Sequence, residues 1–248
     1  MTHKTKGIVL RVIKYGETSV VATMYTELFG IQTYLVNGVR KVQKKSGLAI
    51  MLQPGAILDL EVYHNDSNNM QRIKEANWSV IYEHLLSDVI KNSILTYLLE
   101  LLFKSLKQPE PNADLFYFCE DALLNLDKAE NQITANFALY FSLQLPHFFG
   151  FKIHSPDPQK INHNEIYLDL AEGGFITDKP LHNHFIQGDL ALKTYELLMV
   201  MHPDELTEIK LNKETRRNLL LAYQQYYALH LNDFGQIRSL KILQEVIG

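Results

Sequence analysis

The sequence predicts an α+β protein with two domains, in which a small β-barrel precedes a larger helical domain. The chain has 248 residues, which is enough to form two modest hydrophobic cores. Up to about residue 80, short runs with many alternating apolar and polar positions are separated by Gly, Pro and Asn turn signals. Beyond Trp78, apolar residues recur three and four positions apart, which is the spacing of one helix face. We therefore place the barrel at 1–80 and the helical domain at 81–248.

Five short strands are expected in the barrel, and a turn signal follows most of them. The run 56–63 shows the cleanest alternation, with Leu58, Leu60 and Val62 on one face. Five short strands without a helix-length apolar pattern favour a small closed barrel. The expected strands are 7–14, 18–26, 31–36, 56–63 and 70–78.

The helical domain is expected to contain six helices and one irregular insertion. Asn112 and Asp189 are candidate N-caps, and Pro146 is expected to kink or end its helix. The segment 151–189 is rich in Pro, His and Asn, and it reads as a small hairpin around Gly173 and Gly174. The apolar helical pattern covers 85–102, 113–126, 131 towards 150, 189–202, 213–231 and 239–247.

The net charge of −4 conceals an asymmetry along the chain. Residues 1–50 carry eight Lys and Arg but only two acids, so this fifth of the chain has a charge of +6. The other 198 residues carry 16 basic and 26 acidic side chains, which gives −10. A split of this size indicates that the two parts meet different partners.

The basic residues of the first fifth are the candidate DNA-binding residues. Long cationic side chains on a barrel loop and on an adjacent strand can follow a phosphate backbone. A solvated turn is the alternative reading of the cluster 40–45 taken alone. The candidates are Arg11, Lys14, Arg40, Lys41, Lys44 and Lys45.

Four aromatic residues near these cations could stack on bases. Tyr15 and Tyr63 are candidates of this kind, whereas Phe29 is expected in the core. For Tyr34 the sequence leaves core packing and base stacking equally open.

No catalytic or nucleotide-binding motif is present. The sequence has no P-loop, no GxGxxG, no HExxH and no GxSxG, and no paired carboxylates stand in a recognisable setting. Cys119 is the only cysteine in the sequence. A single cysteine excludes an internal disulfide and a thiolate zinc site. We expect Cys119 to be a buried thiol. We therefore expect a protein that is not an enzyme.

Histidines are the remaining candidate metal ligands, and they lie in the irregular insertion. Only His182 and His184 have a compact spacing, and sites made of histidine alone are uncommon. Ordinary surface histidines are therefore the preferred reading, and we expect no bound metal and no other cofactor. The histidines in question are His154, His163, His182 and His184.

The N-terminus is too short and too charged for a signal peptide, and no apolar window is long enough to cross a membrane. A cytoplasmic, nucleoid-associated protein without a membrane partner is the simplest expectation.

Several segments, in this order and spacing, resemble the bacterial recombination mediator family RecO. The opening Lys6-Gly7-Ile8-Val9-Leu10-Arg11 with Tyr15-Gly16-Glu17-Thr18 is similar to the family's first strand and turn. Asn37-Gly38-Val39-Arg40-Lys41, with Lys44-Lys45-Ser46-Gly47 and Leu52-Gln53-Pro54, is similar to its basic loop. The stretch from Tyr140-Phe141 to Gly150-Phe151 and the tail from His230-Leu231 to Val246 match its later helices. The resemblance thus spans the chain.

The resemblance implies an N-terminal OB-fold, a helical domain and often a zinc site of four cysteines. The insertion 151–189 contains no cysteine, so we expect the zinc to be lost and the hairpin to be held by packing. The resemblance further implies binding to single- and double-stranded DNA, annealing, cooperation with RecR, and recombinase loading onto DNA coated by single-stranded-DNA-binding protein. A protein-only adaptor whose basic loop binds an acidic protein is the alternative.

Single-stranded-DNA-binding proteins present an acidic tail that ends in an apolar residue, so a receptor needs cations beside an apolar pocket. The C-terminal region offers both kinds of group, although its cations could instead balance local acids or a helix dipole. Lys91, Lys104 and Lys107 form a second candidate set. The first candidates are Arg216, Arg217, Leu220, Arg238 and Lys241, with Tyr223 and Leu240 close in sequence.

Overall fold

The computed structural model describes residues 1–38, 47–106, 108–154 and 166–246. The chain forms two compact units, which we describe separately. Unit 1 comprises Met1–Glu83 and Leu106–Leu124, and unit 2 comprises His84–Ser105 and Asn125–Gly248. The segment Leu106–Leu124, which the sequence pattern assigns to the helical domain, thus packs with the strands. No helix in the described part of the chain is long and apolar enough to span a membrane.

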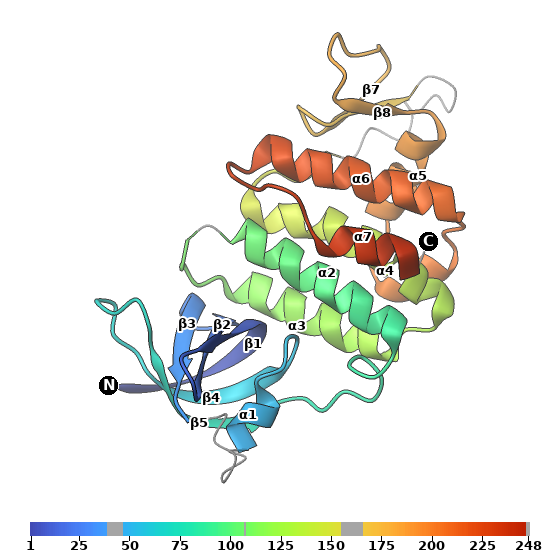
Figure 1. Ribbon diagram of the computed structural model, residues 1–248. Helices are drawn as coiled ribbons and strands as arrows, with labels where there is room; N and C mark the ends of the chain where they lie inside the picture. Colours follow the sequence, from blue (N-terminus) through green and yellow to red (C-terminus); the bar gives the residue numbers. More distant parts are fainter. Residues whose placement is uncertain (39–46, 107, 155–165, 247–248) are drawn as a thin grey trace. The chain divides into compact units, whose positions relative to one another are not determined.

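Unit 1 is built on a five-stranded antiparallel sheet with the order β3-β2-β1-β4-β5 (Figure 1). Together with the helices of unit 2, this sheet confirms the α+β class. The strands are β1 (Thr2–Tyr15), β2 (Ser19–Thr26), β3 (Gly30–Val36), β4 (Ile57–Tyr63) and β5 (Arg72–Trp78).

Strand β1 is long enough to pair with two neighbours, β4 through its first half and β2 through its second. The register shifts between Val9 and Arg11, which marks the bulge where the strand bends. The predicted strand 7–14 misses residues 2–6, because these are polar and show no apolar alternation.

Edge strand β3 meets the residue before edge strand β5 at an isolated parallel bridge between Tyr34 and Gln71. Leu35 N donates to Gln71 O at 3.0 Å, and Gln71 N donates to Thr33 O at 2.8 Å. The predicted closed barrel is therefore joined at this bridge and not along a continuous ladder.

The core of unit 1 lies inside the curved sheet and includes Val9, Ala22, Met24, Leu58 and Val62. Tyr34 is fully buried among these residues, so the structure assigns it to the core and not to base stacking. Helix α1 (Gly47–Met51), which the sequence pattern did not predict, packs partly buried apolar side chains against the same core.

Helix α3 (Ala113–Lys128) begins in unit 1, at the cap predicted for it. Leu115 N donates to the side-chain oxygen of Asn112 at 3.0 Å, and Asn112 O accepts the hydroxyl of Tyr25 at 3.0 Å. The carbonyls of Pro109 and Glu110 lie against Gly30, which has a φ of +62°. These contacts hold the segment 106–124 against the strands.

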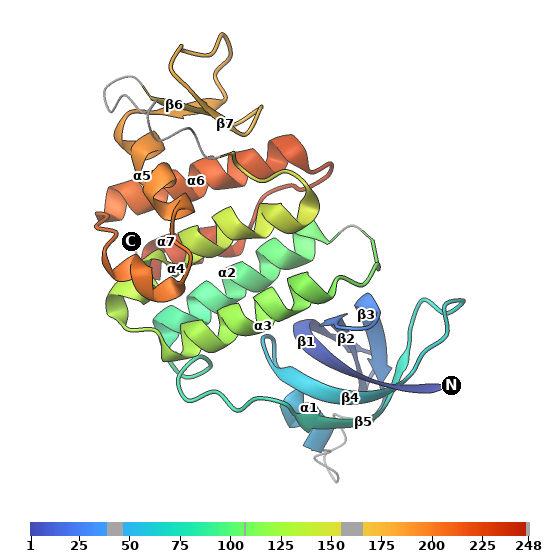
Figure 2. The same cartoon turned by 180° about the vertical axis from the view of Figure 1, so that it is seen from behind.

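Unit 2 is organised around α4 (Asn131–Gln144), which packs against α2 (Val89–Ser105), α5 (Asp189–Leu198) and α6 (Lys213–His230) (Figures 1 and 2). Ten residues of α4 between Ile133 and Leu143 are buried, as expected for a helix that is apolar on all sides. Pro146 ends α4 and opens the 3-10 helix η1 (Leu145–Phe149), as predicted. The remaining helices are η3 (Pro203–Thr207) and α7 (Ser239–Val246).

The N-cap predicted for α5 is wrong by one residue. Gly188 is the N-cap, and Asp189 lies in the first turn of the helix. A carboxylate in the first turn favours the helix through its dipole without capping it.

The insertion forms a small antiparallel sheet of three strands, with β6 between β7 and β8. The strands are β6 (Tyr167–Asp169), β7 (Gly174–Ile176) and β8 (Phe185–Gln187). Polar contacts as well as packing hold this sheet: Asp169 accepts from Ala171 N at 2.8 Å, and His154 N donates to Gly173 O at 2.8 Å.

Candidate nucleic-acid interface

The outward face of β1 carries three exposed side chains at alternate positions, Arg11, Ile13 and Tyr15. Val12, between them, packs against the barrel core, as the two-residue period of a strand requires. Tyr15 is 50% exposed, and Lys14 is exposed next to it near the end of the strand. The second half of β1 therefore presents two cations and one aromatic ring.

This face continues over β2 and β3 in two rows set by the strand register. One row is polar and runs from Arg11 to Thr23 and Thr33. The next is apolar and runs from Ile13 to Val21 and Leu35. Within the described residues, neither Arg11 nor Lys14 forms an ion pair with a carboxylate. Their charges are thus available to an external anion.

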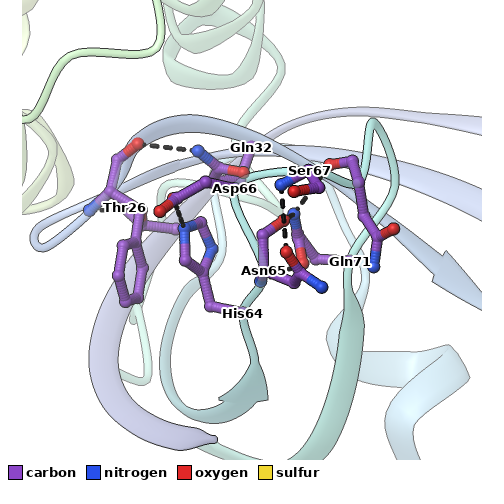
Figure 3. Close-up of polar contacts among 9 residues, drawn as sticks. Thr26, Gln32, His64, Asn65, Asp66, Ser67 and Gln71 are labelled. Carbon is purple, nitrogen blue, oxygen red and sulfur yellow. Dashed lines mark hydrogen bonds and ion pairs between the residues drawn. The ribbon is translucent and has the colours of Figure 1, made fainter.

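The loop between β4 and β5 borders this face and is fixed from within by Gln71 (Figure 3). The Gln71 amide donates to the carbonyls of Asn65 and Asn68, both at 2.9 Å, and accepts from Asn65 N at 3.0 Å. Ser67 N donates to the Asn65 side chain at 3.0 Å. Because Gln71 is only 4% exposed, these bonds are shielded from water and hold the loop in one conformation.

His64 begins the same loop and stacks on Phe29, with ring centroids 3.9 Å apart. Its Nε2 lies 2.9 Å from Asp66 Oδ1, whereas its Nδ1 is buried without a hydrogen-bond partner in the described residues (Figure 3). Phe29 is half-buried and packs against the barrel core, in line with the expectation that it belongs to the core.

Tyr63 and Arg72 are exposed residues next to the loop, and Arg72 is not among the residues predicted from the sequence. They lie directly opposite each other in the β4–β5 register, so their side chains share one face. Tyr63 is 49% exposed. The only sequence signal for Arg72 is a cation at the start of a predicted strand, which is too common to be informative.

The first half of β1 also carries cations, but acidic side chains surround them. Lys6 Nζ donates to Glu120 Oε1 at 2.8 Å, and this hydrogen bond raises the pKa of Lys6. Lys74 donates to Glu61 at 2.8 Å and lowers the pKa of Glu61, which also lies opposite Lys4 across β1 and β4. Lys6 and Lys74 are therefore each paired with a carboxylate.

The basic cluster predicted for the loop after β3 lies outside the described residues. This applies to Arg40, Lys41, Lys44 and Lys45 alike. Their assignment to DNA binding stays a prediction from the sequence.

In unit 2, Arg216 borders a cavity of about 430 Å³ between the start of α4 and the segment before α6. Its Nη1 donates to Leu211 O at 2.7 Å, and its buried Nε–H has no partner within the described residues. Burial lowers the pKa of Arg216. Asn136, on the same cavity, is 3% exposed and donates to Ile209 O at 2.8 Å, while its side-chain oxygen lacks a partner there. One donor and one acceptor beside the cavity are thus buried and unpaired within the described residues.

The other predicted partner-binding residues do not join this cavity. Arg217 and Lys241 are exposed on α6 and α7, and the backbone N–H of Arg238 donates to Glu100 at 2.9 Å. Leu220 is 1% exposed and lies in the core of unit 2, so the predicted surface of charge beside Leu220 is not formed. Residues four positions apart on a helix share a face only approximately. Here the side chain of Leu220, four positions after Arg216, points into the core.

The second candidate set has structural roles where it is described. Lys91 is buried and donates to Asp127 O at 2.6 Å, and Lys104 donates to Phe234 O at 3.0 Å. Lys107 lies outside the described residues.

The histidines of the insertion contact protein groups. His182 Nε2 lies 3.1 Å from Asp169, and His184 Nδ1 lies 2.7 Å from the Gln225 amide. No group of three metal-ligating side chains comes together in the part of the chain that is described, from which His163 is missing. The absence of zinc remains a prediction, which elemental analysis of the purified protein tests.

Cys119 is buried, and burial raises the pKa of its thiol, which disfavours a thiolate nucleophile.

A curved five-stranded antiparallel sheet followed by a helical unit places the chain among multidomain proteins with an N-terminal OB-fold. Residues 1–82 match the family model Recombination protein O N terminal, and residues 86–155 match Recombination protein O C terminal. The chain belongs to the RecO family of DNA repair proteins, which confirms the resemblance noted from its motifs.

Full-length relatives support this assignment. A DNA repair protein RecO from Bacteroides fragilis is 32% identical over 247 residues, which cover 99% of both chains. Proteins of the same name from Phocaeicola vulgatus and Flavobacterium psychrophilum are 29% and 30% identical, and the matches cover 100% of each chain.

Proposed function

We propose that this protein is a recombination mediator that acts by binding DNA and not by catalysis. The observation that carries the proposal is the second half of β1, where Arg11 on the outer face and Lys14 near the end of the strand lack acidic partners in the described residues and Tyr15 is exposed beside them. Phosphate contacts of this kind supply affinity without sequence preference. The family assignment points in the same direction.

In this proposal the backbone of a single strand lies across Arg11, Lys14 and the cluster Arg40, Lys41, Lys44 and Lys45. Contacts to phosphates leave base edges free, so a second, complementary strand can pair with the bound one. The same cations would hold double-stranded product. The acidic remainder of the chain repels DNA and is available to proteins, for which RecR, single-stranded-DNA-binding protein and the recombinase are the proposed partners.

Salt dependence tests the DNA proposal. With about six phosphates neutralised, the logarithm of the association constant should fall with a slope of about −4 against the logarithm of salt concentration. Replacing Arg40, Lys41, Lys44 and Lys45 by Glu should remove most binding while the thermal unfolding midpoint stays close to that of the wild type. Unchanged affinity in this variant would exclude the cluster from the interface.

A protein-only adaptor is the alternative function, in which the basic loop meets an acidic protein. It predicts no measurable binding of single strands at low salt, so the same titration separates the two.

We also propose that the cavity at Arg216 receives the acidic tail of single-stranded-DNA-binding protein. Arg216, a cation on this cavity, suits a carboxylate, and a shift of its side chain would bring its buried, unpaired Nε–H to the ligand. Ala135, Ile209 and Leu211 supply apolar lining for a terminal hydrophobic residue.

Two neighbouring arginines give a matched test of the tail site. Arg216→Gln should weaken binding of an acidic tail peptide about tenfold, because it removes a charge-assisted hydrogen bond. Arg217→Gln removes the same charge from an exposed position and should change affinity less than twofold. Isothermal titration calorimetry measures both. Equal affinities for the two variants would place the tail elsewhere, and the double change Arg216→Glu with Arg217→Glu extends the comparison.

A further inference from the structure

We propose that the groove beside the β4–β5 loop binds one unpaired nucleotide of the DNA strand, with its base against Tyr63 and its phosphate at Arg72. The proposal rests on the DNA-binding function proposed above and adds a site that holds a base. The groove has a volume of about 540 Å³ and is lined by Leu35, Met70 and the loop as well as by these two residues.

The charge of this groove suits a nucleotide. Arg72 is a lining cation, no Asp or Glu lines the groove, and Arg72 forms no ion pair within the described residues. The groove on the other side of the same loop has about 450 Å³ and the opposite character, since Asp66 lines it and no Lys or Arg does. A phosphate is therefore attracted to the first groove and not to the second.

The walls of the groove suit a base. Tyr63 presents a half-exposed ring, and stacking on an aromatic ring is the usual way that proteins hold an unstacked base. Tyr63 and Arg72 are paired residues on neighbouring strands. The ring and the guanidinium group are therefore close enough to contact the base and the phosphate of one nucleotide. Leu35 and Met70 extend the apolar surface next to the ring.

The loop adds unused hydrogen-bonding groups at a fixed position. Asn68 and Asn69 line this groove as well as the one on the other side of the loop, and their side-chain amides form no hydrogen bond within the described residues. Gln71 holds the backbone carbonyl of Asn68, so presenting this residue to a ligand requires little ordering of the loop backbone. An amide offers both a donor and an acceptor, which is the pattern that base edges complement.

The groove also adjoins the proposed phosphate track. Leu35, which lines it, ends the apolar row that begins at Ile13 on β1. A strand that crosses Arg11 and the outer face of β2 and β3 therefore reaches the groove without leaving the barrel surface.

The test compares a thymidine oligonucleotide with an abasic strand of the same length, using fluorescence anisotropy and the full chain. The wild type should bind the base-bearing strand about tenfold more tightly, because one stacked base is removed from the abasic strand at this site. Tyr63→Leu should reduce this preference and Tyr63→Phe should keep it. Arg72→Gln should reduce the salt slope by about 0.7, the contribution of one phosphate on a single strand.

Asn77→Ala is the matched control for the double variant Asn68→Ala with Asn69→Ala, since Asn77 is an exposed asparagine on β5 that lines a different groove. The double variant should reduce the preference for bases, and the control should leave it unchanged. Equal binding of the two strands by the wild type, or a full preference in Tyr63→Leu, would overturn the nucleotide site while the DNA function stands. Failure of the wild type to bind either strand would overturn both proposals.

Discussion

The two halves of β1 carry the same kind of charge but differ in what surrounds it. Lys6 in the first half meets Glu120, and Lys4 lies opposite Glu61, whereas Arg11 and Lys14 in the second half have no acidic partner in the described residues. The strand bends between the halves, at the shift of register after Val9. One continuous strand thus contributes to two surfaces with different electrostatic character.

This difference shows that a count of cations does not locate an anion-binding surface. The +6 charge of the first fifth includes Lys6, which is paired with Glu120 of α3, and Lys4, which lies opposite Glu61 of β4. A phosphate gains little from a cation that is already paired, since it must compete with a carboxylate at hydrogen-bonding distance. The unpaired half of β1 is the more favourable place for DNA.

The largest effect is expected from breaking the contact that holds the acidic segment 106–124 in place. Gly30→Ala puts a Cβ at a φ of +62° and 2.4 Å from Glu110 O, so both strain and a backbone clash oppose it. We expect a loss of about 3 kcal/mol in the free energy of unfolding. Urea denaturation of the full chain measures it.

Gly16→Ala is the matched control, because Gly16 has a φ of +59° but no atom within 4 Å of the added Cβ. It should cost about 1 kcal/mol from strain alone. Similar losses in both variants would show that the carbonyls of the segment do not press on Gly30.

A smaller effect is expected from neutralising each half of β1 in turn. Arg11→Gln with Lys14→Gln should weaken single-strand binding by roughly tenfold to thirtyfold and reduce the salt slope by about 1.4, the contribution of two phosphates. Lys4→Gln with Lys6→Gln removes the same formal charge and should leave the slope unchanged. Fluorescence anisotropy at several salt concentrations measures both. Equal slopes for the two variants would remove the distinction between the halves.

The sequence predicted the elements well where periodicity is strong and the ends of elements are signalled locally. All five strands and the Asn112 cap follow from patterns within a few residues, and so does the end of α4 at Pro146. The first residues of β1 were missed because they are polar, and α1 was missed because five residues are too few to show a period.

Features that depend on distant residues could not be read from the sequence. Lys6 and Glu120 are 114 positions apart, so nothing local indicates that this lysine is paired. The burial of Tyr34 follows from the bridge to Gln71, which is also a long-range contact. Arg216 was predicted as a partner-binding cation, but its cavity requires Asn136, and the two meet only through the fold.

The smallest effect concerns the Lys6–Glu120 pair itself, which the comparison requires to be formed at neutral pH. Its hydrogen bond raises the pKa of Lys6 above its value in the unfolded chain. A raised lysine pKa contributes stability that is fully present below the unfolded value and is lost as pH rises through the folded one. The contribution should therefore be complete at pH 7 and decline above about pH 10.5.

Glu120→Gln isolates this contribution, because it removes the charge and keeps a hydrogen-bond acceptor of similar size. At pH 7 the variant should be less stable than the wild type by about 0.5 kcal/mol, the value of a partly exposed pair. At pH 11 the difference should shrink, since this pH lies above the unfolded value and Lys6 begins to lose its proton. Paired urea denaturation curves at the two pH values measure this difference, in which the titration of other groups cancels. A difference that stays constant or grows between pH 7 and pH 11 would mean that Lys6 is not held by this carboxylate, and the first half of β1 would then be open to DNA as well.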